Sequence, residues 1–344
     1  MSCERLGRIA HDAWVGERTM SLISNNATLG LNGGITGGEG EAVIQSASYP
    51  EVPATTVENT TAGASAASAQ GGLVINFIAD PSVIAKWGTD WQASGFGQAL
   101  NDAAQFFETH ISNPITINID VGWGEVNGQA LGSRSLGQFF AFGNNFLSYS
   151  QVRQDLLNDT TSPADATVFA NLPSTDPITG THQYRVCNAQ EKALGLLPGN
   201  ASAPDGAIGF SSSASFDYNT NNVAVPANEY DFVGVAEHEI SQAMGRLSLQ
   251  GSPYTINGVT TDAYGIIDLF RYSSPGVPQE TRGQPAYFSL NDGTTDLNNF
   301  STGGDPADWA PSAGNDAFDA TSPIGVENAV SSTDVQVWTL SATT

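Results

Sequence analysis

The hydrophobic pattern of the chain becomes regular only beyond residue 71. A β-branched and aromatic run at 73–78 predicts a buried strand, and strict alternation of apolar and polar residues at 115–122 predicts a second strand. Between the two, apolar residues recur at every third or fourth position from 91 to 111, which predicts a long amphipathic helix. Residues 1–71 are rich in Ser, Asn, Thr, Gly and Ala and show no such period, so we expect a flexible N-terminal extension or leader there.

The rest of the chain is predicted to mix short helices with short strands. Helical periods predict three helices, at 149–158, 164–171 and 189–196. A series of short strands and turns is predicted at 205–227. Because helices and strands follow one another without a fixed repeat, we expect one α+β domain over 72–340, built on a twisted mixed sheet. Its last part, near 250–340, is acidic and rich in Asn and Gly, which predicts a loop-rich subdomain.

The segment at 230–247 is predicted to be a central helix, buried on one side. At about 100° per residue, its apolar residues form one stripe: Phe232, Val233, Ala236, Ile240, Ala243, Met244 and Leu247. The face centred on His238 holds mostly small or polar residues: Asp231, Gly234, Val235, Ser241, Gln242 and Gly245. We therefore expect the His238 face to border a cleft that a ligand enters.

The charge of the chain excludes some classes of partner. Acidic residues outnumber basic ones by 35 to 11, and a net charge of −24 repels nucleic-acid phosphates, so we expect no nucleic-acid partner. The apolar runs are shorter than the about 20 residues that a membrane helix needs, so we expect no membrane span. Cys3 and Cys187 are too far apart in sequence to indicate a disulfide framework or a cysteine zinc site.

The composition is typical of an exported protein. Charged residues make up only 13 %, while Gly, Asn, Ser and Thr are abundant, which favours an extracellular or cell-surface bacterial protein. The first twenty residues lack the apolar core of a signal peptide, which leaves three alternatives: a leader has been removed, export uses a C-terminal signal, or the protein stays inside the cell.

His238 and Glu239 match the first half of the zinc motif H-E-x-x-H. In that motif, two histidines one helical turn apart bind zinc, and the glutamate deprotonates a metal-bound water. Here Gln242 takes the place of the second histidine. Gly245 lies where the longer metzincin pattern H-E-x-x-H-x-x-G-x-x-H has its glycine, and Ser248 lies where that pattern has its third histidine.

Four phrases of the sequence resemble those of exported bacterial metzincin-like zinc metalloproteases, and the similarity covers about residues 72–340. The phrases are ITINIDVGWGEVNGQALGS (115–133), DGAIGFSSSASFDY (205–218), YDFVGVAEHEISQAMGR (230–246) and YGIIDLFRYSSPG (264–276). The resemblance implies a zincin-like α+β domain, zinc-assisted hydrolysis of a peptide or protein substrate, and secretion. In this family an acidic residue is common where Gln242 stands.

A zinc ion at this site needs ligands from elsewhere in the chain. Gln242 offers only a neutral carbonyl oxygen, which suits calcium better than zinc. Asp268, inside the apolar, strand-like run at 265–270, is our first candidate for a further ligand, followed by Asp262 and His182.

Structural roles remain open for the same residues. Glu239 is placed to pair with Arg246, and Asp268 to pair with Arg271 or Arg246. The aspartates between 291 and 319 either bind calcium through loop carboxylates or form a solvated acidic loop: Asp292, Asp296, Asp305, Asp308, Asp316 and Asp319.

Three functions follow from these alternatives. The first is a secreted metal-dependent endopeptidase in which His238, Gln242 and Asp268 hold zinc, and Glu239 acts as general base on a bound water. The second is a catalytically inactive pseudoprotease that acts as a calcium-binding surface or matrix protein. The third is a carbohydrate-binding module that uses exposed tryptophans: Trp87, Trp91, Trp123 and Trp309.

Overall fold

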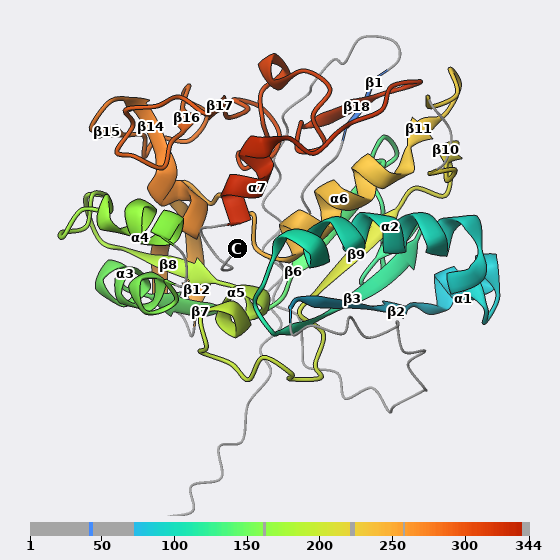
Figure 1. Cartoon of the computed structure of the whole chain (residues 1–344), viewed down its shortest axis with the longest axis horizontal. Helices are drawn as coiled ribbons and strands as arrows, with labels where there is room; N and C mark the ends of the chain where they lie inside the picture. Colours follow the sequence, from blue (N-terminus) through green and yellow to red (C-terminus); the bar gives the residue numbers. More distant parts are fainter. Residues whose placement is uncertain (1–40, 44–71, 161–162, 221–223, 257–258, 339–344) are drawn as a thin grey trace, which may run out of the picture. The chain divides into compact units, whose positions relative to one another are not determined.

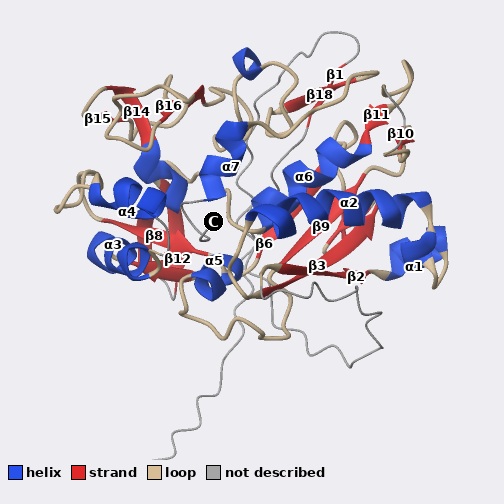
Figure 2. Ribbon diagram, viewed as in Figure 1, coloured by secondary structure: helices blue, strands red, loops and turns tan. Residues whose placement is uncertain are grey.

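A mixed four-stranded sheet supports the helix that carries His238 (Figures 1 and 2). The computed structural model describes residues 41–43, 72–160, 163–220, 224–256 and 259–338, which all belong to one compact unit, Gly37–Thr344. The strands of the sheet are β2 (Val74–Ala79), β3 (Thr116–Trp123), β6 (Gly137–Ala141) and β9 (Gly206–Phe210). Their order is β2-β3-β9-β6, with β2, β3 and β9 parallel and β6 antiparallel at one edge. The two strands predicted near the start of the ordered region are therefore confirmed as neighbours, β2 and β3.

Two helices pack side by side on this sheet (Figure 1). They are α2 (Gly95–His110) and α6 (Phe232–Ala243), and α6 contacts both β6 and β9. The Ser94 side chain caps the first turn of α2. The fully buried rings of Phe96 and Phe232 join the two helices, with centroids 5.2 Å apart. The long helix and the central helix predicted from periodicity are confirmed, although α6 is shorter than the predicted segment.

Two smaller sheets follow later in the chain. One has the strand order β12-β13-β8-β7 and the other β15-β14-β16-β17 (Figure 2). The bounds of these strands are Asn145–Leu147 (β7), His182–Val186 (β8), Ser252–Ile256 (β12), Val259–Tyr264 (β13), Arg271–Ser274 (β14), Val277–Pro278 (β15), Tyr287–Phe288 (β16) and Asn298–Asn299 (β17). The helices α3 (Tyr149–Asn158) and α4 (Pro163–Ala170) pack against each other, and α3 also contacts β8.

The remaining elements are short. The helices among them are α1 (Pro81–Trp87), α5 (Asn188–Ala193), α7 (Ser332–Trp338), and the single-turn helices η1 (Trp91–Ala93), η2 (Ile266–Phe270) and η3 (Pro311–Ala313). The strands pair in twos: β4 (Glu125–Val126) with β5 (Gln129–Ala130), β10 (Phe216–Asp217) with β11 (Tyr230–Asp231), and β1 (Glu41–Val43) with β18 (Thr321–Pro323). Apart from β1, the extension predicted at 1–71 lies outside the described residues.

The fold is α+β, with helices and mixed sheets in one unit, as predicted. The strand-like run at 265–270 is a correction, because it forms the 3-10 helix η2. A short apolar run does not distinguish a buried strand from a buried helical turn, which explains the error. Among the described residues, no helix combines the length and the apolar character that a bilayer-spanning segment requires.

Candidate functional site

His238 lies in the middle of α6, and its side chain is fully buried. Its Nδ1 lies 2.9 Å from the carbonyl oxygen of Ala317, and its Nε2 lies 3.2 Å from a terminal nitrogen of Arg246. A carbonyl oxygen only accepts and a guanidinium only donates. The Ala317 carbonyl therefore requires a proton on Nδ1, whereas Nε2 faces both a donor, the Arg246 guanidinium, and an acceptor, Asp308 Oδ1 at 3.2 Å.

Arg246 reaches His238 by folding back along the helix. Gly245 ends α6 with a φ of +120°, in a region that side-chain-bearing residues rarely adopt, so the chain turns at this point. The Arg246 guanidinium donates through Nε to Ser241 Oγ at 2.8 Å and through NH1 to the Ala307 carbonyl at 2.8 Å. The buried guanidinium is thus held on several sides, with one edge against the histidine.

Asp308 brings a carboxylate to the same point. Its Oδ1 accepts hydrogen bonds from Arg246 NH1 at 3.1 Å and from Gln242 Nε2 at 2.9 Å, and it lies 3.2 Å from His238 Nε2. All four side chains are buried. Because the amide nitrogen of Gln242 faces Asp308, its carbonyl oxygen points elsewhere and has no hydrogen-bond partner. We call His238, Gln242, Arg246 and Asp308 the buried cluster.

Glu239 lies beside the buried cluster, against the edge strand β6. A Cβ on Gly137 would come within 2.6 Å of Glu239 Cγ and 2.8 Å of its carboxyl carbon, so only a glycine fits there. Neither carboxyl oxygen of the buried Glu239 has a hydrogen-bond partner. Burial is the main cause that raises the pKa of Glu239 well above its usual range, and the charge of Asp308 raises it further. The charge of Arg246 lowers this pKa in part. The predicted pairing of Glu239 with Arg246 is replaced by the pairing of Arg246 with Asp308.

The His238 face of α6 is covered rather than open, which corrects the predicted cleft. The cover consists of residues 305–319, which we call the covering segment. Within it, Ala307, Asp308 and Ala317 bond to the helix, and the Phe318 ring lies 4.3 Å from the guanidinium carbon of Arg246. The small and polar residues of this face therefore make room for a packed segment of the same chain.

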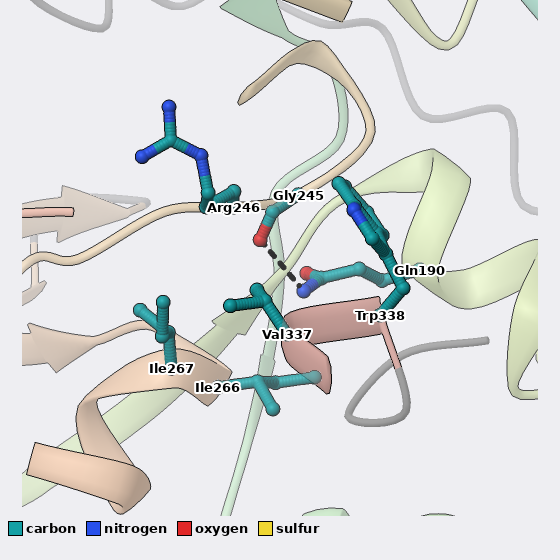
Figure 3. A pocket seen from close by; sticks show the side chains of 7 residues that line it. All are labelled: Gln190, Gly245, Arg246, Ile266, Ile267, Val337 and Trp338. Atoms are coloured by element: carbon teal, nitrogen blue, oxygen red, sulfur yellow. Dashed lines mark hydrogen bonds between the residues drawn. The ribbon is translucent and has the colours of Figure 1, made fainter. Parts of the chain in front are cut away.

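A small cavity lies next to Gly245 but does not open the buried cluster (Figure 3). Its volume of about 10 Å³ suits one water molecule. Gln190 donates from Nε2 to the Gly245 carbonyl at 3.0 Å on its wall, and the Arg246 guanidinium points away from it (Figure 3). The charge of Arg246 therefore faces His238 and not this cavity.

The buried cluster does not fit a zinc ion as it stands. Zinc needs ligands at about 2.0–2.3 Å that surround it tetrahedrally. Here the Nε2 lone pair and the Asp308 carboxylate both face the guanidinium, and Gln242 presents its N–H groups. Within the described ranges, no three His, Cys, Asp or Glu side chains are gathered so as to hold one metal ion.

Asp268 has a different role from the one predicted. Its Oδ2 accepts backbone N–H groups from Leu249 at 2.9 Å, Gln250 at 3.1 Å and Gly265 at 2.8 Å, and its Oδ1 accepts the Ser248 hydroxyl. Both oxygens are used in tying the loop after α6 to the start of η2. The structure therefore does not bring Asp268 into the buried cluster.

The two further ligand candidates lie together in the sheet β12-β13-β8-β7, and their contacts are not those of a metal site. Asp262 and His182 are register partners of β13 and β8, and Asp262 is exposed. His182 Nε2 lies 3.0 Å from Asp176 Oδ2, and its Nδ1 lies 3.2 Å from the Gly180 carbonyl. These contacts account for both ring nitrogens of His182.

The acidic stretch is not a uniformly solvated loop. Asp292 and Asp296 are exposed, whereas the four aspartates of the covering segment are buried: Asp305, Asp308, Asp316 and Asp319. Burial and the neighbouring carboxylates raise the pKa of Asp319 to about 8. The tryptophans likewise do not form an exposed platform, because Trp91 and Trp309 belong to the core and Trp87 packs 5.6 Å from Trp123.

Arg246 and Asp308 complete the cluster with His238, and neither contact was predicted from the sequence. The sequence indicated Glu239 or Asp268 as the partner of Arg246, and either a calcium-binding or a solvated acidic loop around Asp308. The position of Arg246, two turns beyond His238 on the helical wheel, indicated that it lies near the histidine. Asp308 gave no such signal, because it is 66 residues from Gln242 in sequence. Comparison with protein-family models, with curated proteins and with solved structures finds no match.

Proposed function

We propose that this chain is a catalytically inactive, pseudoprotease-type protein that acts as a calcium-binding surface or matrix protein. One observation carries the inactive part of this proposal: the Arg246 guanidinium lies against both His238 Nε2 and Asp308 Oδ1, at 3.2 Å and 3.1 Å. A built-in cation already neutralises the carboxylate and satisfies the imidazole lone pair. Glu239 is itself fully buried, which opposes access of a peptide to its carboxyl group.

Electrostatics supports this proposal. Two unit charges of the same sign about 4 Å apart repel by about 4 kcal/mol at an effective dielectric constant of about 20, and a divalent ion doubles this. A zinc ion bound to His238 would also lose the second imidazole that H-E-x-x-H supplies, because Gln242 stands there. Both effects oppose metal binding while Arg246 stays in place.

The excess of acidic groups supports the calcium part. The chain has a net charge of −24, and a buried carboxylate oxygen of Asp319, which is not paired with Arg246, lacks a hydrogen-bond partner. Calcium prefers carboxylate oxygen ligands. Location outside the cell, where calcium is abundant, belongs to the same proposal.

Elemental analysis of the untagged full chain, together with a peptidase assay, tests this function. We expect far less than one zinc per chain and no cleavage of casein at any added zinc concentration. Calcium is expected to raise the melting temperature, while magnesium at the same concentration does so less. Stoichiometric zinc with casein cleavage contradicts the inactive part, and equal effects of the two cations contradict the calcium part.

Glu239 favours a second candidate, the metal-dependent endopeptidase predicted from the sequence. Its carboxyl group, without hydrogen-bond partners, lies next to the histidine and against edge strand β6. In that case Glu239→Gln abolishes casein cleavage without changing metal content. Cleavage by the unaltered protein that persists in Glu239→Gln excludes this role for the glutamate.

A further inference from the structure

The buried cluster has the spacing of a metal site that an arginine has filled. Two zinc ligands at about 2.05 Å and a tetrahedral angle lie about 3.3 Å apart. His238 Nε2 and Asp308 Oδ1 are 3.2 Å apart. The Arg246 guanidinium contacts both atoms and supplies a positive charge at this point.

The surroundings of His238 are also those of a metal ligand. Its Nδ1 donates to the Ala317 carbonyl, which fixes the ring and directs the Nε2 lone pair toward Asp308. Metal-bound histidines almost always make such a hydrogen bond through their other nitrogen. The covering segment supplies this hydrogen bond through the Ala317 carbonyl.

Further donor atoms are within reach. Asp308 Oδ2 and Gln242 Oε1 are buried and have no hydrogen-bond partner. A half-turn of the Gln242 amide, whose nitrogen now lies 2.9 Å from Asp308 Oδ1, directs its carbonyl oxygen toward the same point. The amide is held in its present orientation because its N–H group donates to the Asp308 carboxylate.

We propose that Arg246 is a resident cation in a latent metal site, and that removing its guanidinium allows His238, Asp308 and Gln242 to bind a divalent transition metal such as zinc. Arg246 follows α6 rather than belonging to it, so its replacement leaves the helix and its two ligands in place. This inference rests on the proposed function in one respect, which is that the unaltered chain holds no zinc at this point.

The test compares zinc binding by the full chain and by two variants, Arg246→Met and Arg271→Met. Arg271 is the matched control, since it is equally buried and stacks on Phe300 at 3.9 Å, but it has no contact with His238. With zinc alone as the probe, in competition with a chromogenic chelator, we expect Arg246→Met to bind at least 100-fold more tightly than the unaltered chain and Arg271→Met. Adding His238→Ala to Arg246→Met should abolish the gain.

A second arm covers the case in which Arg246→Met fails to fold. With the arginine intact, Gln242→His restores the zinc motif, yet we expect its zinc affinity to stay within tenfold of the unaltered chain. Tight zinc binding by Gln242→His overturns the inference, as does an Arg246→Met variant that is folded by circular dichroism but binds zinc no better than Arg271→Met. Stoichiometric zinc in the unaltered chain overturns the proposed function instead, so the two failures are distinguishable.

Discussion

At the residue scale, the central feature is a buried ion pair that is well supplied with hydrogen bonds. Arg246 and Asp308 each have further partners, so neither charge is left isolated. Burial of such a pair contributes little net stability, but removing one partner strands the other charge. The pair therefore fixes how the covering segment docks on α6 more than it stabilises the fold.

Breaking this pair from either side should be costly. We expect Arg246→Met and Asp308→Asn each to lower the free energy of unfolding by about 3–5 kcal/mol, because each leaves an uncompensated buried group. The double variant should lose at least about 1 kcal/mol less than the sum of the two. Urea unfolding of the four proteins measures this, and strict additivity would show that the two residues are not coupled.

Gly137 tests the position of Glu239. A methyl group at Gly137 collides with the Glu239 side chain, so Gly137→Ala should destabilise the protein by about 1–3 kcal/mol. Glu239→Ala should relieve the collision, giving a favourable coupling above about 0.5 kcal/mol in thermal or urea unfolding. Gly303→Ala, where a Cβ meets nothing within 4 Å, is the neutral control. An absence of coupling would place Glu239 elsewhere.

Asp319 makes stability depend on pH in a defined direction. Its pKa is raised from 3.8 to about 8, so the folded chain keeps a proton that the unfolded chain releases. This stabilisation is complete below pH 3.8 and is lost as pH rises through about 8. The contribution of Asp319 to the free energy of unfolding falls by at most about 1.4 kcal/mol per pH unit. Asp319→Asn should therefore gain stability relative to the unaltered chain between pH 5 and 8 in urea unfolding, and a constant difference contradicts this.

At the element scale, the periodic segments were predictable, including the shorter helices α3, α4 and α5, whereas the single turn η2 was not. The stripes of α2 and α6 and the alternation in β3 follow from packing against one sheet, which imposes a period that the sequence must carry. The run at Ile266–Phe270 is fully buried as a single turn and carries no period. Its conformation is decided by Asp268, whose carboxylate gathers three backbone N–H groups from two chain segments.

This role of Asp268 gives a prediction for stability rather than for metal binding. Hydrogen bonds to a charged group contribute about 1.5–3 kcal/mol each, so Asp268→Ala should lower the free energy of unfolding by about 3 kcal/mol or more. The exposed Asp262 is the matched control, and Asp262→Ala should change it by less than about 0.5 kcal/mol. Urea unfolding and metal content are measured on both. Loss of bound zinc in Asp268→Ala alone would restore its predicted role as a ligand.

At the scale of the whole molecule, the site is made by distant parts of the chain. His238 and Glu239 were identifiable because their motif is local, and Gly245 because the chain must turn there. The pairing of Arg246 with Asp308, 62 residues away, has no local signature. The covering segment was predicted as a loop because its aspartates suggest solvent, whereas its apolar Ala317 and Phe318 dock it on the helix.

The central claim is that a guanidinium, not a metal ion, contacts both His238 Nε2 and Asp308 Oδ1. Anomalous diffraction at the zinc absorption edge, from crystals of the full chain grown with zinc chloride, tests it most directly. The account predicts no anomalous peak within about 2.3 Å of His238 Nε2, and continuous density for the Arg246 guanidinium against both side chains. An anomalous peak bonded to His238 Nε2 and Asp308, with Arg246 displaced, would contradict it.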